Sequence, residues 1–395
     1  MKVKIRIGNE VKEYTGAWED HTLLEVFQEL GITQVHAPCG GNGTCKKCLV
    51  TVEGLGEVLS CQTQCKDGMC VTVAEEQKSA IAENGNCYLY PADAGEGLLA
   101  ACDIGTTTVV CHLLDGATGV RLCTVSAPNA QRSFGADVIS RIQASVDSGL
   151  DKLQSAIVDQ INGMLVQLKQ KAGRTEDIRR LAVAGNTVMS HLFCGLSPES
   201  IGVAPFTPLS LFGESYDAKQ IGIEGCETVY VVPSIAGYVG GDIVADLAAV
   251  QMHSSVLAED GEKETLMLDI GTNGEMVLGK SGSYVCCATA AGPAFEGAEI
   301  AMGMPAASGA ISKVWLEDGK ICCSTINDAP AVGICGSGLI DALAVFLETE
   351  LLDETGLIAD EDEVEEAYAG YLGEDEDGTC VYLTDTVKVT QADVR

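Results

Sequence analysis

The feature that most constrains the fold of this chain is a short phrase that occurs twice. Residues 103–107 read Asp-Ile-Gly-Thr-Thr, and residues 269–274 read Asp-Ile-Gly-Thr-Asn-Gly. In each copy an apolar run ends at the aspartate, and a second apolar run with β-strand character follows the turn. This order predicts a strand, a tight turn and a returning strand. Two such hairpins predict a duplicated lobe, in which each lobe offers one hairpin to a shared nucleotide.

The chemistry of the two turns suits phosphate binding. Glycine lets the backbone approach a ligand closely, and turn amides with Thr or Asn side chains donate hydrogen bonds to phosphate oxygens. The aspartate that ends each first strand, Asp103 or Asp269, is placed to hold Mg²⁺ through water. One copy alone is equally consistent with an ordinary hairpin, whereas the pair is much more specific. The candidate phosphate-binding residues are Gly105, Thr106, Thr107, Gly271, Thr272, Asn273 and Gly274.

A glycine-rich loop near the N-terminus carries three closely spaced cysteines. Cys39, Cys45 and Cys48 have the spacing C-x5-C-x2-C, and Cys61 follows on the next element. Four thiolates arranged in this way favour a [2Fe–2S] cluster, because the glycines let the loop wrap the inorganic core. Zinc is the main alternative, although zinc ribbons more often use two C-x2-C pairs and only one occurs here.

The N-terminal region has the pattern of a small β-grasp domain. Alternation predicts a strand over residues 3–7, Thr22 and Glu25 predict a capping box at a helix start, and apolar runs predict strands over 49–52 and 70–73. From Leu98 an α/β pattern follows, with helices predicted over 137–146, 153–171, 187–193, 242–252 and 339–351. The expected organisation is an α+β ferredoxin-like domain (1–75), a linker (76–97), an α/β first lobe (98–268) and a second lobe of the same duplicated core (269–395).

The end of the chain predicts an incomplete second lobe. Residues 390–393 resemble a helix start, yet the chain stops at Arg395. Fewer residues follow Asp269 than separate it from Asp103, so we expect the last part of this lobe to be missing. The acidic residues of 353–377 predict a solvated surface insertion.

Composition narrows the classes of partner. Lys and Arg number 24 against 57 Asp and Glu, which gives a formal net charge of −33. This charge argues against nucleic acid or an anionic membrane surface, because both require basic patches. It suits a basic protein partner, although solubility alone is a sufficient explanation. No apolar run approaches the roughly 20 residues of a membrane span. With no signal peptide, a cytoplasmic protein with reduced or metal-bound thiols is expected.

These motifs together resemble known families. The cysteine loop resembles plant-type and adrenodoxin-like ferredoxins; those leave a longer gap before the fourth cysteine, so Cys65 is an alternative to Cys61. The two Asp-Ile-Gly-Thr phrases resemble the acetate and sugar kinase, heat-shock chaperone and actin superfamily. The whole chain is similar to the reductive activators of corrinoid enzymes. Further stretches that carry this resemblance are residues 129–138, 184–189, 204–208, 235–242, 290–298 and 333–341.

The resemblance implies an ATP-dependent reduction of a corrinoid protein from Co(II) to Co(I), in a methyltransferase system of anaerobic metabolism. Its partners would be that corrinoid protein and a low-potential electron donor, and a homodimer is left open. Cys39, Cys45, Cys48 and Cys61 would ligate iron, and the two hairpins would hold ATP. Asp103 and Asp269 would position Mg²⁺, and Glu296 would orient the attacking water. Asn186, Gly336 and Ser337 are further candidates for the nucleotide cleft.

From the residues alone, three other functions are alternatives, and each differs from a reductive activator in one feature. A sugar-kinase-like phosphotransferase has no use for a one-electron carrier. A plain ferredoxin-type electron-transfer protein with a degenerate nucleotide core would reduce its partner without ATP. The activators of 2-hydroxyacyl-CoA dehydratases follow a similar logic but lack an N-terminal ferredoxin. The sequence leaves open the corrinoid partner, the electron donor and the oligomeric state.

Overall fold

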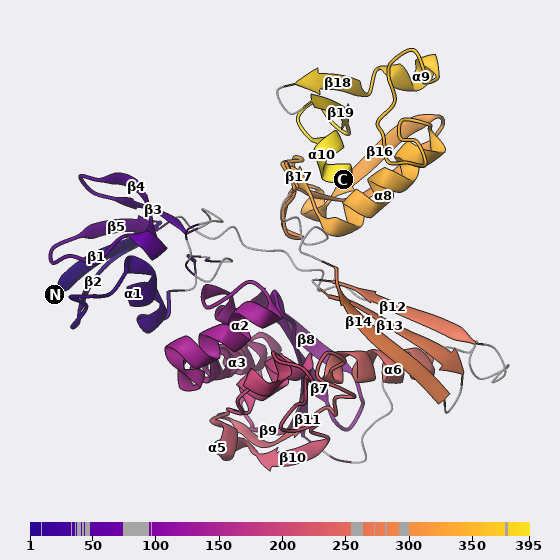
Figure 1. The fold of residues 1–395 in the computed structure, drawn as a ribbon. Helices are drawn as coiled ribbons and strands as arrows, with labels where there is room; N and C mark the ends of the chain where they lie inside the picture. The colour runs from indigo at the N-terminus through magenta and orange to yellow at the C-terminus, as the bar shows by residue number, and fades with distance from the viewer. Residues whose placement is uncertain are drawn as a thin grey trace. The chain divides into compact units, whose positions relative to one another are not determined.

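Several separate sheets make up the protein, and each is described by itself (Figure 1). The computed structural model describes residues 1–8, 10–32, 34–35, 37, 41, 43, 48–73, 95, 97–253, 264–271, 273–280, 283–291, 300–375 and 378–395. The predicted site residues Cys39, Cys45, Thr272 and Glu296 lie outside these residues, as does most of the predicted linker. The chain divides into two compact units. The larger unit contains the N-terminal sheet and a six-stranded sheet, both described below.

The N-terminal sheet has the order β2-β1-β5-β3-β4, with β1 and β5 parallel. Its strands are β1 (Lys2–Ile7), β2 (Glu10–Thr15), β3 (Leu49–Val52), β4 (Gly56–Leu59) and β5 (Cys70–Val73). Helix α1 (Leu23–Glu29) begins at the predicted capping box: Glu25 N–H donates to Thr22 Oγ1, and Glu25 Oε2 accepts from Thr22 N–H. Its apolar stripe packs on the sheet together with Cys48 and Cys61. The predicted β-grasp domain is confirmed.

The first lobe is a six-stranded sheet of order β10-β11-β9-β6-β7-β8. Its strands are β6 (Leu98–Ile104), β7 (Thr108–Asp115), β8 (Arg121–Pro128), β9 (Ile178–Gly185), β10 (Glu214–Asp217) and β11 (Cys226–Val231). β6 and β11 both run parallel to β9, so the three strands end at the same edge of the sheet. Parallel α/β sheets bind their ligands at this carboxyl edge.

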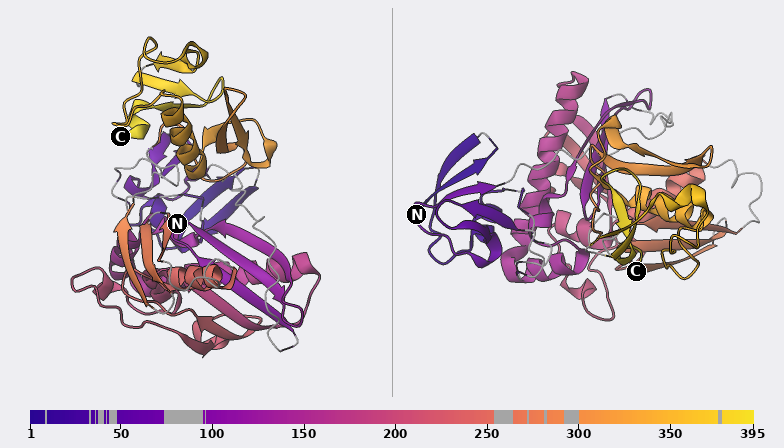
Figure 2. Two further views of the ribbon diagram at one scale, coloured as in Figure 1. Left: turned by 90° about the vertical axis from the view of Figure 1, so that its right-hand side faces the viewer. Right: turned by 90° about the horizontal axis from the view of Figure 1, so that it is seen from above.

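Helices cover the sheet of the first lobe. They are α2 (Val138–Ala144), α3 (Leu150–Ala172), α4 (Thr187–Phe193), α5 (Ala218–Ile221) and α6 (Gly241–His253). α3, the long magenta helix of Figure 2, packs the apolar stripe of Leu153, Ile157, Ile161 and Leu168 against the sheet. The break predicted between two helices is instead a π-helical segment, Ser145–Gly149, that joins α2 to α3.

Three smaller sheets follow. The first contains β12 (Thr265–Ile270), β13 (Asn273–Lys280) and β14 (Ser283–Ala290). The second contains β15 (Ala310–Glu317), β16 (Lys320–Thr325) and β17 (Gly333–Ile334). The third contains β18 (Leu372–Asp375), β19 (Gly378–Tyr382) and β20 (Lys388–Thr390). The helices here are α8 (Gly336–Glu348), α9 (Glu366–Ala369) and α10 (Gln391–Val394). The predicted helix start at residues 390–393 is confirmed, because Thr390 and Asp393 form a capping box.

The last two sheets share one apolar core. Ile311, Leu339, Phe346 and Val389 are all buried in it. Most described residues of the acidic segment 353–377 are exposed, as predicted, and the segment also contains α9 and β18. Within the described part of the chain, no helix combines the length and apolar character needed to cross a membrane.

Candidate functional site

The first repeat is a hairpin, as its sequence predicts. β6 and β7 pair up to Ile104 and Val109, and the turn between them is residues 105–107. A Cβ atom on Gly105 would lie 2.7 Å from the Thr108 carbonyl oxygen, so the tight turn requires glycine there. Asp103 is exposed near the carboxyl end of β6, whereas Thr106 in the turn is only 7% exposed. The predicted residues of this turn therefore lie at the carboxyl edge of the sheet.

Asn186 joins this turn from a distant part of the sequence. Parallel pairing of β6 with β9 sets Gly185 beside Ile104, which brings Asn186 to the turn. The side-chain Nδ2 of Asn186 donates to Thr106 Oγ1 over 3.1 Å. Its Oδ1 accepts from Met189 N–H over 2.9 Å, so the same side chain is the N-cap of α4. The structure thus brings together two predicted candidates, Asn186 and Thr106.

Asn129 and Arg141 also hold the turn, although neither was among the predicted site residues. Asn129 donates from Nδ2 to Gly105 O over 2.7 Å and from its backbone N–H to Thr107 O over 2.9 Å. Arg141 is fully buried and donates to the carbonyl oxygens of Thr106 and Gly135. A signal for Asn129 existed, since it opens one of the stretches that carried the family resemblance. Nothing in the sequence marks Arg141 as buried.

The third parallel strand brings a glycine pair to the same edge. Gly240 follows β11, and a Cβ atom there would clash with Asn186 Cα and lie 2.7 Å from Thr187 N. Gly241 begins α6, and Asp242 in its first turn accepts from Ile243 N–H over 2.9 Å. This close approach requires glycine at 240, and a Cβ atom on Gly241 would lie 2.9 Å from Val232 O. The carboxyl edge of the six-stranded sheet therefore combines the hairpin turn, the Asn186 side chain and the start of α6.

The second repeat is also a hairpin. β12 and β13 are neighbours in their sheet, and Gly271 N–H donates to Asn273 O over 2.8 Å across the turn. Asp269 is half-buried, and burial raises the pKa of its carboxyl above the ordinary value. Gly274 is buried and is followed by Glu275, a buried carboxylate that was not among the predicted site residues. Both copies of the phrase thus form the predicted strand, turn and strand.

The start of α8 shows a close packing of helix on strand. A Cβ atom on Gly338 would clash with Ile311 O in β15. Ser337 Oγ donates to Ser312 O over 3.0 Å, and Cys335 is the N-cap residue. Gly336 itself is buried. These contacts explain the Gly-Ser-Gly sequence through packing, and a nucleotide contact by Gly336 and Ser337 stays a prediction.

Two of the four predicted iron ligands meet in the core of the N-terminal domain. Cys48 and Cys61 are 0% and 6% exposed, and their Sγ atoms lie 3.2 Å apart. Ser60 N–H donates to Cys48 O over 2.9 Å and fixes the two segments together. Paired thiols at this distance fit a shared metal group with thiolate ligands. Without Cys39 and Cys45, the described residues contain no set of three or more His, Cys, Asp or Glu side chains arranged for a metal ion.

Cys65, the alternative fourth ligand, is also buried, and desolvation raises the pKa of its thiol. Its backbone N–H donates to His21 O over 2.8 Å. The contact with Cys48 Sγ is made by Cys61, which therefore fits the ligand set better than Cys65.

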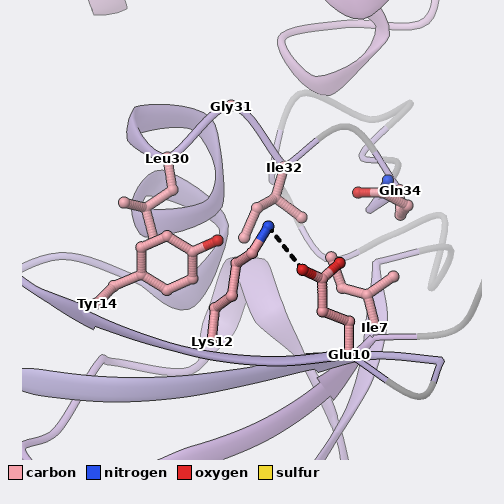
Figure 3. Close-up of a pocket in the computed structure, with 8 residues that line it drawn as sticks. All are labelled: Ile7, Glu10, Lys12, Tyr14, Leu30, Gly31, Ile32 and Gln34. Atoms are coloured by element: carbon pink, nitrogen blue, oxygen red, sulfur yellow. Dashed lines mark ion pairs between the residues drawn. The ribbon is translucent and has the colours of Figure 1, made fainter.

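A cavity of about 530 Å³ lies on the N-terminal domain beside the edge strand β2 (Figure 3). Lys12 and Glu10 form an ion pair of 3.0 Å at its rim. Its lining residues are Ile7, Glu10, Lys12, Tyr14, Leu30, Gly31, Ile32 and Gln34. This set includes none of the predicted site residues, and we assign it no role.

Family models match three consecutive parts of the chain. Residues 7–76 match the 2Fe-2S iron-sulfur cluster binding domain. Residues 98–255 match the RACo middle region, and residues 263–395 match the C-terminal domain of RACo, the ASKHA domain.

Individual relatives agree with these matches. The corrinoid activation enzyme RamQ of Eubacterium limosum is 32% identical over an alignment of 423 residues. The alignment covers 86% of this chain and 70% of the relative. The [Co(II) methylated amine-specific corrinoid protein] reductase of Methanosarcina barkeri is 28% identical over 294 residues, and the chain spans about half of it, 51%.

A solved structure extends the similarity to nearly the whole chain. The reductive activator for corrinoid, iron-sulfur protein superposes with a TM-score of 0.64 and 30% identity. The similarity covers 99% of this chain and 80% of the solved one. The chain therefore belongs to the family of RACo-type reductive activators, in which a 2Fe–2S ferredoxin domain precedes an actin- and sugar-kinase-like ASKHA core.

Proposed function

We propose that this protein uses ATP to reduce the Co(II) form of a corrinoid protein to Co(I), and so restores a methyltransferase system. The observation that carries the proposal is the similarity over 99% of the chain to a reductive activator for a corrinoid, iron-sulfur protein. The corrinoid reductase and activation enzyme among the curated relatives support the same reaction class. The corrinoid cobalt is the substrate, and a low-potential donor supplies the electron.

Cys39, Cys45, Cys48 and Cys61 would hold a [2Fe–2S] cluster in the N-terminal domain. When bound, such a cluster supplies one-electron transfer at a low potential, near about −400 mV for plant-type sites. The burial of Cys48 and Cys61 beneath α1 excludes water from their sulfur atoms. Their 3.2 Å separation supports the proposal that both thiols would ligate one metal group.

The first hairpin would bind the phosphates of ATP. Gly105, Thr106 and Thr107 would offer backbone amides, and Asn186 would keep the Thr106 hydroxyl in place. Arg141 lies behind the turn with its positive charge fully buried and bonded to Thr106 O. A fixed cation there favours an anionic ligand at the turn, because charges interact more strongly in a low-dielectric interior.

The second lobe would complete the nucleotide site. Gly271, Thr272, Asn273 and Gly274 would contact phosphate from the second hairpin. Asp103 and Asp269 would position Mg²⁺ and its water, and Glu296 would orient the attacking water. Burial raises the pKa of Asp269, and Mg²⁺ is a cation that would favour its ionised form. Gly336 and Ser337 would lie near the nucleotide at the start of α8.

ATP would act through conformation. Reduction of Co(II) corrinoid from ordinary donors is uphill, and a bound nucleotide shifts an equilibrium only by its different affinity for two states. We infer that ATP binding or hydrolysis changes how the lobes engage the corrinoid protein. The altered cobalt environment then favours Co(I).

The test mixes the anaerobically reconstituted protein with Co(II) corrinoid protein and a chemical reductant, then follows the Co(I) absorption with and without ATP. We expect Co(I) to accumulate only with ATP and Mg²⁺. Equal reduction without nucleotide would instead identify a plain electron-transfer protein. ATP consumption that requires a small hydroxylated substrate and no corrinoid protein would identify a phosphotransferase.

A further inference from the structure

We propose that Gln62 is a positioning residue of the iron–sulfur site, whose side chain bonds both Gly41 O and Cys61 Sγ and raises the reduction potential of the bound group. The inference rests on the proposed [2Fe–2S] site and deepens it. Gln62 is neither one of the predicted ligands nor a cysteine, and it lies next to Cys61 in the sequence.

Two contacts of one nitrogen atom carry the proposal. Gln62 Nε2 donates to Gly41 O over 2.8 Å and to Cys61 Sγ over 3.6 Å. A side-chain amide nitrogen has two hydrogens, so both bonds can form at once. The Gly41 carbonyl can only accept, and this fixes the orientation of the amide with its nitrogen toward the loop.

Two glycines, Gly41 and Gly43, leave room for this side chain and for Cys61. Gly41 and Gly43 both have left-handed backbones, with φ of 88° and 77°. A Cβ atom on Gly43 would lie 3.1 Å from Gln62 Cγ, and one on Gly41 would lie 3.8 Å from Cys61 Cβ. Glycine at these two positions lets the loop pass close to Gln62 and Cys61.

The backbone of Gln62 is held independently of its side chain. Gln62 ends the short 3₁₀ helix Ser60–Gln62. Ser60 N–H donates to Cys48 O over 2.9 Å, and Thr63 Oγ1 donates to Leu59 O over 2.9 Å. The amide can therefore act as a fixed bridge between Gly41 and the segment that carries Cys61.

A hydrogen bond to a ligand sulfur changes the redox energy of an iron–sulfur group. The reduced form carries one more negative charge, part of which resides on the thiolate ligands. An N–H donor stabilises that charge, and hydrogen bonds to the sulfurs are one of the determinants of the potential. Removing the Gln62 donor should therefore lower the reduction potential, and removing its bond to Gly41 O should loosen the loop.

The test compares Gln62→Leu with Gln64→Leu in the full, anaerobically reconstituted chain. Gln64 is also an exposed glutamine, two positions along, and it pairs through its backbone with Thr22. The reduction potential is measured by a redox titration followed by electron paramagnetic resonance, and cluster loss to an iron chelator is timed. We expect a more negative potential and faster loss in Gln62→Leu, and wild-type values in Gln64→Leu.

A second variant decides the outcome if Gln62→Leu assembles no cluster. Gln62→Met keeps a side chain of similar length, adds no charge and cannot donate, so it should also shift the potential downward. Wild-type potentials in both Gln62 variants would overturn this inference and leave the proposed function intact. A wild-type protein without a [2Fe–2S] spectrum would overturn the proposed function and this inference together.

Discussion

The side chain of Asn186 donates a hydrogen bond of 3.1 Å to the hydroxyl of Thr106, and both side chains are buried. Asn186 follows β9 and Thr106 follows β6, so the bond ties the carboxyl ends of two neighbouring parallel strands. The same Asn186 side chain caps α4 through Met189 N–H. One residue therefore stabilises a helix start and fixes the turn that we propose to bind phosphate.

The two roles of Asn186 can be separated by substitution. Asn186→Ala removes both and should destabilise the protein by about 2 kcal/mol, roughly 1 for the cap and 1 for the hydrogen bond. Asn186→Ser keeps a capping oxygen and should lose only about 1 kcal/mol. Both variants should bind ATP more weakly than wild type. Urea unfolding and ATP titration measure the two effects; equal stability of the two variants would contradict the dual role.

Arg141 should matter more than any exposed arginine. Arg141→Met removes the buried hydrogen bonds that Arg141 donates to the carbonyl oxygens of Thr106 and Gly135, which should cost about 3 kcal/mol. Arg180 on β9 is exposed and gives the matched control, because Arg180→Met should change stability by less than about 0.5 kcal/mol. Urea unfolding of the two variants measures the difference. Similar losses in both would show that the buried bonds contribute little.

The choice of the fourth iron ligand is directly testable. Cys61→Ser should abolish the visible absorption of the reconstituted [2Fe–2S] protein, because Cys61 is the cysteine that contacts Cys48. Cys65→Ser should retain that absorption. Iron and sulfide analysis of the two purified variants supports the optical result. Retention of a full cluster in Cys61→Ser, with its loss in Cys65→Ser, would assign the ligand to Cys65.

Local patterns predicted much of this structure. The capping box of Thr22 and Glu25 and the glycine turns of both repeats depend on residues close in sequence, so they were visible without coordinates. Asn186 was predicted for the cleft because it ends an apolar strand. Its hydrogen bond to Thr106 was not predicted, because that bond depends on the parallel pairing of β6 with β9.

Other features depend on contacts that no local pattern reveals. Arg141 lies in a short helix, and nothing in the neighbouring sequence predicts its burial. It is nevertheless fully buried, with hydrogen bonds to Thr106, Gly135 and Met189. The sequence pattern predicted two helices, over 137–146 and 153–171, with a gap between them. The π-helical turn Ser145–Gly149 instead carries the chain from one helix into the next.

The pH dependence of stability should reveal His191. Its Nδ1–H donates to Thr187 O over 2.7 Å, and its Nε2 accepts from Leu209 N–H and Ser210 N–H over 3.2 and 3.3 Å. Burial lowers the pKa of this imidazole, so the folded state holds it neutral. Below about pH 6.5 the unfolded chain takes up the proton first, and stability should fall by up to about 1.4 kcal/mol per pH unit until the lowered pKa is passed.

His112 also has a pKa lowered by burial, so the contribution of His191 is the difference between wild type and His191→Gln. Urea unfolding between pH 5 and 8 measures it, and parallel curves for the two proteins would contradict the assignment.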